Sequence, residues 1–230
     1  MLLVIKILIA FHFLYPGNLN PVPFPGHIPG DFNKTSIIVD GQRIFKDENT
    51  ISLEKMVTPW LLFYTNQYRK EHGLDTLKYD DCLLKAATYH ADYLFNESVA
   101  TGQFKLGHVE DAASKWFKGK GPSERALTAG CQKYCGENAL YFTLPSLSST
   151  DFKNKEKLNA AAKKIARDMV YDQWHSSRGH RDNMLTKGYT SLGVSVAIGK
   201  NASDYSQLSQ KELQQTAVNM VVFGIQVLAY

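Results

Sequence analysis

The chain ends in the segment AVNMVVFGIQVLAY, residues 217–230, which is apolar at nearly every position. A strand with one face in water alternates apolar and polar residues, whereas a strand covered on both faces is a continuous apolar run. The segment therefore predicts a central strand covered on both sides. Residues 190–199, TSLGVSVAIG, alternate apolar with small residues and predict a second strand with one buried face. The polar residues 200–215 between them predict a long hairpin loop.

Helical periodicity precedes these strands. Residues 155–177, KEKLNAAAKKIARDMVYDQWHSS, place apolar residues on one side and lysines on the other, and we expect Gly179 to end this helix. Residues 80–95 form a second amphipathic helix. An earlier helix ends at Gly73, with Ser52 and Thr58 as alternative N-caps; we favour Thr58, because Pro59 then occupies the first helical position. Helices early and strands late predict an α+β fold with helices layered around an antiparallel sheet.

The N-terminal region differs in composition from the rest. Residues 1–15, MLLVIKILIAFHFLY, have the length of a secretory apolar region and are shorter than a membrane span. We expect a signal peptide over residues 1–20, with an anchor or an unprocessed start as alternatives, and no transmembrane span later. Residues 16–30 hold five prolines and three glycines, which favours an extended linker over residues 21–53. Residues 54–230 then form one folded domain.

Composition and cysteines suit a secreted globular protein. The chain has 230 residues, 44% of them hydrophobic, and its net charge of +4 includes no long basic block, which argues against nucleic-acid binding. Sequons at Asn33, Asn96 and Asn201 are candidate glycosylation sites. Of the cysteines Cys82, Cys131 and Cys135, we expect one disulfide with one thiol left over. Which two pair is open, and three buried thiols are the alternative.

The polar stretch WHSSRGHRDNML, residues 174–185, is the densest run of reactive side chains. Basic residues at a helix end have a simple electrostatic explanation, so the run is either a polar helix terminus or part of a site. His108, within the irregular residues 96–150, and Glu137, in CGENAL, are further candidates. Two histidines and a glutamate that converge in a cleft could bind a divalent metal or perform acid–base chemistry.

These segments resemble a known family. The stretches NQYRKEHGLDTLKYDDCLLKAATYHADYL, GH, PSERALTAG, CGEN, WHSSRGHRDNML and SLGVSVA occur in the order seen in the CAP superfamily, which includes cysteine-rich secretory proteins, antigen 5 and pathogenesis-related group-one proteins. The resemblance covers about residues 57–228. It implies a three-layer α-β-α sandwich with a central antiparallel sheet and a large cleft.

The resemblance also implies a set of site residues. The family cleft carries two histidines and two acidic residues, and in some members the histidines bind zinc. His108 and His180 match the histidines, and they are the candidate zinc ligands. Glu137 matches one acid, whereas Ser177 stands where the second acid is usual, so this chain lacks one carboxylate. The family's first-helix histidine is replaced by Thr65.

Three functions remain compatible with this sequence. We favour a secreted, extracellular binding or interaction module whose cleft holds a metal, sterol, other lipid or peptide. The alternative is a metal-dependent hydrolase or peptidase with Glu137 as general base. In that reading, His108, Glu137 and His180 would be the catalytic candidates, and Ser177 a weaker candidate nucleophile. The third is a structural protein whose polar cluster only closes the core.

Overall fold

The computed structural model describes residues 37–39, 42–144, 147, 149–201, 209 and 219–230. The predicted signal peptide lies outside these residues, as does most of the predicted loop 200–215. The first elements are β1 (Ile37–Val39), β2 (Gln42–Phe45), α1 (Glu48–Glu71), β3 (Lys78–Tyr79), α2 (Asp81–Thr101) and α3 (Pro122–Ala129). They are followed by β4 (Cys135–Leu144), α4 (Ser149–Lys153), α5 (Lys155–Asp168), the π-helical turn η1 (Met169–Trp174), α6 (Arg178–Met184), β5 (Ser191–Asn201) and β6 (Asn219–Ala229).

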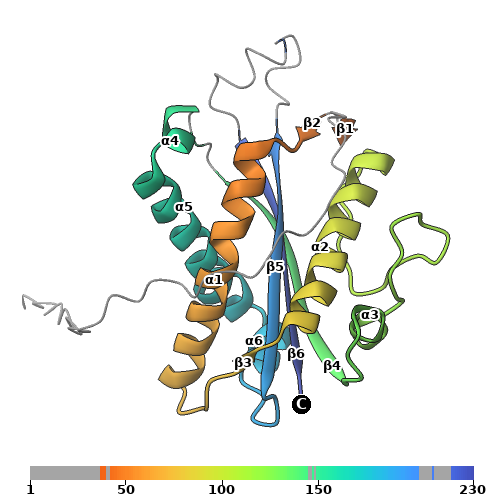
Figure 1. The fold of residues 1–230 in the computed structure, drawn as a ribbon, viewed down its shortest axis with the longest axis vertical. Coiled ribbons are helices and arrows are strands. Elements are labelled where there is room, and N and C mark those ends of the chain that lie inside the picture. Colours follow the sequence, from red (N-terminus) through yellow and green to blue (C-terminus); the bar gives the residue numbers. More distant parts are fainter. Residues whose placement is uncertain (1–36, 40–41, 145–146, 148, 202–208, 210–218) are drawn as a thin grey trace, which may run out of the picture.

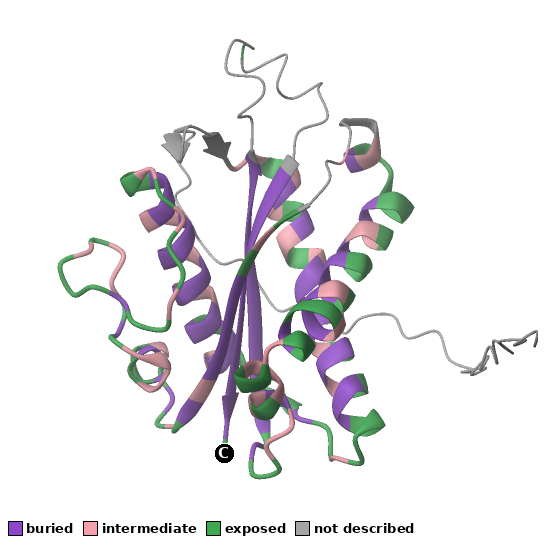
Figure 2. Cartoon of the chain, turned by 180° about the vertical axis from the view of Figure 1, so that it is seen from behind, coloured by how far each residue is buried: buried purple, intermediate pink, exposed green. Residues whose placement is uncertain are grey.

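The sheet is organised around β6. Its strand order is β1-β2-β5-β6-β4, and β3 pairs in parallel with the start of β5. β6 runs antiparallel to both of its neighbours, β5 and β4. Residues 220–229 are buried throughout, and they alternate between the two cores on opposite faces of the sheet. The prediction of a central strand covered on both sides is confirmed, and Figure 2 shows β6 buried along its length.

Helices cover both faces of this sheet, as Figure 1 shows. α1, α5 and η1 pack on one face around the first core, and α2 and α3 pack on the other. The predicted α+β fold, a three-layer α-β-α sandwich with a central, mainly antiparallel sheet, is therefore confirmed. In β5, alternate residues such as Val194 and Ile198 enter the first core as predicted, but the small residues between them are buried too. Gly193 explains part of this, because a Cβ there would lie 2.0 Å from the backbone of Leu83 in α2.

The first helix begins eleven residues earlier than we predicted from Pro59. Asp47 is its N-cap and forms a capping box with Thr50, so Thr58 as N-cap is wrong and Pro59 lies inside α1. A proline within a helix removes one backbone hydrogen bond and costs about 3 kcal/mol. The capping box and the complete burial of Leu53 and Val57 offset that cost. The predicted linker over residues 21–53 therefore also contains β1, β2 and the start of α1.

The later helices differ from the prediction at their ends. α2 continues past Phe95 to Thr101, where Gly102 takes the left-handed conformation that ends helices. The predicted long helix 155–177 is α5 followed by η1, a wider turn that brings Trp174 fully into the core. Ser177 then adopts an extended backbone and α6 starts. Gly179 lies inside α6 and has no positive φ, so the prediction that it ends the helix is wrong.

Among the described residues, no helix is long and apolar enough to cross a membrane.

Candidate functional site

His108 and Glu137 meet, although they come from different parts of the fold. His108 lies in the segment between α2 and α3, and Glu137 is the third residue of β4. His108 Nδ1 is 3.0 Å from Glu137 Oε1, which is hydrogen-bond distance. The histidine side chain is 50% exposed, whereas that of Glu137 is 1% exposed. The pair therefore has a buried acid beneath an accessible imidazole.

Glu137 is surrounded by positively charged or protonatable groups. Arg125 Nη2 donates to Glu137 Oε2 at 2.6 Å, and His90 Nε2 lies 3.6 Å from Glu137 Oε1. Burial raises the pKa of Glu137, but the hydrogen bond from His108 and the charges of His90 and Arg125 outweigh it, so the net pKa is lowered. Glu137 is accordingly a stable carboxylate whose two oxygens are both engaged.

His180 lies in α6, and its backbone oxygen accepts from Asn138, the residue after Glu137. The pKa of His180 is lowered, first by burial and second by the nearby charge of His108. The lowered pKa favours a neutral His180 at pH 7. Ser177 is the N-cap of α6 and is partly exposed, but its side chain makes no capping hydrogen bond. A proton-accepting partner that would activate Ser177 is therefore not apparent.

A chain of amides fixes α6 against β4. Asn138 is fully buried, and its Nδ2 donates to His180 O at 3.0 Å and to Gln226 Oε1 at 2.8 Å. Asn183 Nδ2 donates to Glu137 O at 3.1 Å and to Asn138 Oδ1 at 2.9 Å. Gln226 Nε2 in turn donates to Thr65 Oγ1 at 2.8 Å. The side chain of Asn183 thus links the two stretches that carry Glu137 and His180.

Gly136 is needed for this junction. An ideal Cβ on Gly136 would lie 2.2 Å from Tyr189 Oη, so a side chain at this position would require Tyr189 to shift. The glycine thus lets Tyr189 pack against the start of β4, next to Glu137. Each residue of the Gly-Glu-Asn triplet has its own role. Gly136 allows the close approach of Tyr189, Glu137 holds a buried charge, and the side-chain amide of Asn138 links β4 to α6.

Sequence reasoning missed three charged members of the site. His90 is fully buried, and both of its ring nitrogens lie within hydrogen-bond distance of oxygen atoms. Glu110 was not singled out, although an acid two residues after His108 projects to the same side in an extended segment. Arg125 pairs with both Glu137 and Glu110. It lies in α3, whose Pro122 at the start and Gly130 after the end were available helix signals.

The cysteines form one disulfide, as predicted. Cys82 at the start of α2 is bonded to Cys131, and Cys135 is a buried free thiol. Burial raises the pKa of Cys135 to about 11, which makes it unreactive. Asp80, Cys82 and Cys131 are the one group of three or more potential metal ligands that lie within 4.8 Å of one another among the described residues.

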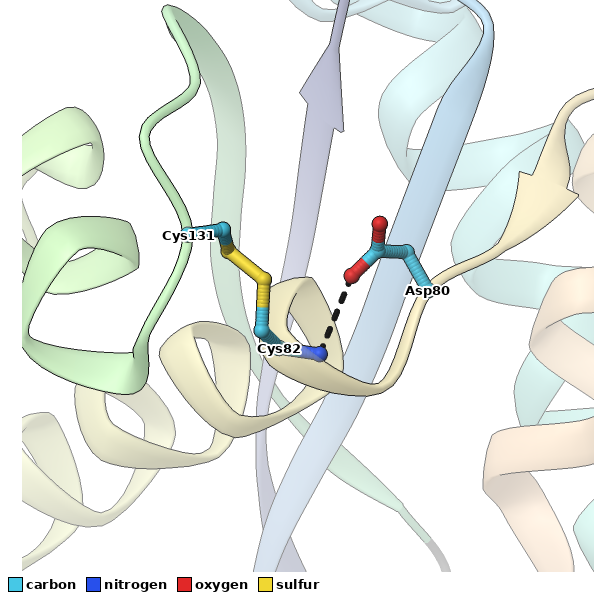
Figure 3. Close-up of side chains that lie close together, drawn as sticks. All are labelled: Asp80, Cys82 and Cys131. Carbon is cyan, nitrogen blue, oxygen red and sulfur yellow. Dashed lines mark hydrogen bonds between the residues drawn. A yellow bond between two sulfur atoms is a disulfide. The ribbon is translucent and has the colours of Figure 1, made fainter.

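That group is poorly suited to a metal. The two sulfurs are bonded to each other, and Asp80 Oδ1 accepts from the backbone N–H of Cys82, as Figure 3 shows. The other Asp80 oxygen pairs with Lys133 at 2.6 Å. A zinc site needs free thiolates, so the geometry favours a helix cap beside a disulfide.

The three sequons have different positions. Asn33 lies outside the described residues, and Asn201 is the last residue of β5. Asn96 lies in α2, where its Nδ2 donates to Asp92 O and where Ser98 of the same sequon is fully buried. Glycosylation at all three remains a prediction.

Comparisons with known proteins agree with this architecture. The sequence model of the "CAP: Cysteine-rich secretory protein family" matches residues 62–209, which is more than half of the chain. Similar solved structures include an extracellular protein with an SCP domain from Bacillus anthracis, with 16% identity and a TM-score of 0.49; the match covers 80% of this chain and 44% of that one. The CAP domain of enterococcal PrgA has 18% identity and a TM-score of 0.39, over 75% of this chain and 60% of that one.

A third similar structure is an outer surface protein of Borrelia burgdorferi, with 14% identity, a TM-score of 0.35, and coverage of 79% of this chain and 96% of that one. A comparison with curated protein sequences found no match. The structural similarities are too distant to transfer a ligand or an activity, and the family match does not depend on them. On that match, the chain belongs to the CAP family of cysteine-rich secretory proteins.

Proposed function

We propose that this protein is a secreted CAP-domain binding module, with a cleft in which His108 and His180 hold a divalent metal above Glu137. The observation that carries the proposal is the contact between His108 Nδ1 and the buried carboxylate of Glu137. A carboxylate accepts but does not donate, so it fixes the proton of His108 on Nδ1. The lone pair of Nε2 is then free for a ligand, which is the arrangement in which histidines usually bind metals.

Zinc fits the donor chemistry only in part. His108 Nε2 and a neutral His180 offer two imidazole ligands, and zinc prefers four ligands. These two residues do not form a group of three potential ligands with any other described residue. Bound zinc would supply a Lewis acid with open coordination positions, to be filled by water or by oxygen atoms of a second ligand. Such a site is suited to holding a ligand that itself offers an oxygen donor.

The surroundings of His108 favour a partly apolar ligand. Leu106 and Val109, on either side of it in the sequence, are 50% and 62% exposed. Exposed aliphatic side chains beside polar groups are typical of sites that take amphipathic molecules. Sterols, other lipids and peptides all meet that description, and each stays a candidate.

The hydrolase alternative receives less support. A general base needs a free lone pair and a pKa near the working pH. Both oxygens of Glu137 are occupied and its pKa is lowered, so it is a weak base without access to water. The missing second carboxylate at Ser177 points the same way. We therefore expect binding rather than catalysis.

Secretion is part of the proposal. The disulfide between Cys82 and Cys131 is of a kind that persists in oxidising compartments. The apolar residues 1–15 and the sequons point to the same route. Retention of the full-length chain in the reducing cytosol when it is expressed in its own cells would contradict it.

The proposal is tested by titrating zinc into the purified protein by calorimetry near neutral pH. We expect saturable binding in the wild type and its loss in the double variant His108→Ala, His180→Ala. His175→Ala is the matched control, because His175 belongs to the same polar stretch but contacts Tyr68 instead. A fluorescent sterol, a fatty acid and a peptide library are then compared with and without zinc. A folded wild-type protein that binds neither zinc nor any of these probes would contradict the proposal.

A further inference from the structure

We propose that the protein binds an acidic polysaccharide, a sugar chain with sulfate or carboxylate groups, on a surface separate from the candidate metal ligands. The surface consists of Lys85 and Tyr89 of α2 and of Lys115, Trp116 and Lys118 in the segment between α2 and α3; we call it the basic–aromatic surface. Its lysines are exposed and its rings are partly buried. Binding of this polymer does not require zinc; only its location outside the cell rests on the proposed function.

Both rings of this surface have ammonium groups beside them. Lys85 Nζ and Lys118 Nζ lie 5.8 and 5.6 Å from the centroid of the Tyr89 ring. Lys115 Nζ lies 4.4 Å from the ring centroid of Trp116. At these distances a ring attracts a cation, although only weakly at an exposed site. Two lysines from different segments therefore gather beside one tyrosine, where their like charges add.

The lysines of the basic–aromatic surface are not neutralised within the fold. Lysines at other positions, such as Lys46, form ion pairs with carboxylates. Within the described part of the chain, no carboxylate forms an ion pair with Lys85, Lys115 or Lys118. Over residues 105–120, four lysines are exposed against a single exposed acid. Unpaired positive charge concentrated on one face attracts polyanions.

The segment between α2 and α3 is held in place although it has little regular structure. Tyr93 Oη of α2 accepts from Asp111 N at 2.9 Å, and Glu97 Oε1 accepts from Ser114 Oγ at 2.5 Å. In Figure 1 this segment runs beside α2. A surface that is ordered before it meets its ligand loses less conformational entropy on binding.

These contacts spread the basic–aromatic surface along α2. Lys118 lies beside Tyr89. Lys115 follows Ser114, whose hydroxyl donates to Glu97. Tyr89 and Glu97 are about two helical turns, or about 12 Å, apart along the helix axis. The two groups of ring and lysine therefore suit an extended chain with several charges better than a single small anion.

The two rings favour a sugar chain over a bilayer or a nucleic acid. Trp116 packs against the second core and Tyr89 is partly buried, so neither protrudes in the way that a ring inserted into a bilayer does. Nucleic-acid bases stack on open ring faces, whereas here an ammonium group already lies over each ring. Sulfate or carboxylate groups can reach these ammonium groups where they lie, while the C–H groups of the sugar contact the exposed part of each ring.

The experiment measures binding of the full-length protein to heparin, hyaluronan and polygalacturonate by calorimetry near physiological salt. We expect saturable binding to at least one of them, and an affinity that falls as salt is added, because salt screens exposed charges. The triple variant Lys85→Gln, Lys115→Gln, Lys118→Gln should bind about tenfold more weakly. Tyr89→Leu keeps an apolar side chain without the ring, and it should weaken binding by a smaller factor of about two to five.

The matched control removes the same charge from the other side of the sheet. Lys155→Gln, Lys163→Gln, Lys164→Gln changes three exposed lysines of α5, which packs on the opposite face from α2. We expect this variant to bind the polysaccharide almost as tightly as the wild type. Chemical denaturation of each variant confirms that the fold is intact.

Three results would overturn the assignment. The first is no binding to any of the three polysaccharides, and the second is an equal loss of affinity in both triple variants. The third is binding to phosphatidylserine vesicles or to a single-stranded thymidine oligonucleotide as tight as that to the polysaccharide. The double variant His108→Ala, His180→Ala should bind the polysaccharide like the wild type, so failure of the metal site and failure of this surface are distinguishable.

Discussion

Two largely buried glutamates in this protein have pKa values that move in opposite directions. Glu137 accepts from Arg125 and His108 with His90 nearby, and its pKa is lowered. The pKa of Glu54 in α1 is raised, because burial is the largest influence on it. Lys46 is the cation that lies against this carboxylate, at 2.8 Å. Asp92 near Lys46 raises the pKa of Glu54 further. The residue type is the same, and the number of positive neighbours decides the result.

The difference separates a structural cluster from the candidate site. Glu54 accepts from Ile198 N in β5 at 2.6 Å, and Lys46 links it to Asp92 in α2, so this cluster joins α1, α2 and the sheet. The cluster at Glu137 does the same for β4, α3 and α2, but it also supports an accessible histidine. A carboxylate held in its charged form under an exposed ring is a mark of a site rather than of a core.

The comparison is tested most strongly by neutralising each glutamate. Glu137→Gln leaves Arg125 buried with fewer acidic partners, and we expect it to destabilise the fold by about 3–5 kcal/mol. Glu54→Gln keeps an oxygen for Ile198 and leaves Lys46 paired with Asp92, so we expect a loss of about 1–2 kcal/mol. Chemical denaturation measures both. Equal losses would show that the two clusters do not differ in the way their neighbours suggest.

Removal of the disulfide should affect the cleft side first. Cys82→Ser opens a loop of 49 residues in sequence separation, which corresponds to a loss of about 2–4 kcal/mol. The bond ties the start of α2 to the residues before β4, so amide exchange should accelerate there more than around Glu54. Cys135→Ser is the control, because Cys135 is unpaired. Uniform acceleration throughout the fold would contradict this localisation.

Acidification should act on the two glutamates with opposite sign. A lowered folded-state pKa means that Glu137 stabilises the fold above the ordinary glutamate pKa, and that this contribution is lost as the pH falls through the folded value. For Glu54 the folded state holds its proton more tightly, so its contribution declines as the pH rises from the ordinary value through the raised one.

Stability curves between pH 3 and 7 measure these effects. We expect the difference between wild type and Glu137→Gln to shrink on acidification below about pH 4.5, by about 1.4 kcal/mol for each pH unit at most. For Glu54→Gln, stability between the ordinary and raised pKa should fall less steeply with rising pH than in the wild type. If the stability of both variants depended on pH in the same way, the opposite pKa shifts of Glu137 and Glu54 would be contradicted.

The smallest effect on stability is expected at the exposed part of the cleft. His108 is half-exposed and its ring contributes little burial, so His108→Ala should cost no more than about 1 kcal/mol. Zinc binding should nevertheless be lost. Denaturation and calorimetry on the same sample separate the two effects, and a large loss of stability with unchanged zinc affinity would place His108 in the core instead of the site.

Much of the fold could be predicted from the sequence, and the candidate site residues could be named from it. The continuous apolar run of residues 217–230 and the lysine-backed helix at 155–168 carry their own periodicity, and His108, Glu137 and His180 stand in recognisable motifs. Pro59 misled us, since local propensity was outweighed by burial of Leu53 and Val57. The π-helical turn also escaped prediction, because it leaves no change in the apolar spacing before Trp174.

By itself, then, the sequence determined the layered α+β architecture and the residue types available for the candidate site. Only the tertiary structure decided that Cys82 pairs with Cys131, that Arg125 and Glu110 join Glu137, and that His90 faces two acceptors at once. Periodicity is a local property, so it can be read directly from the order of residues along the chain. The charge of a buried side chain depends on neighbours that are distant in the chain, and these meet only when the helices close over the sheet.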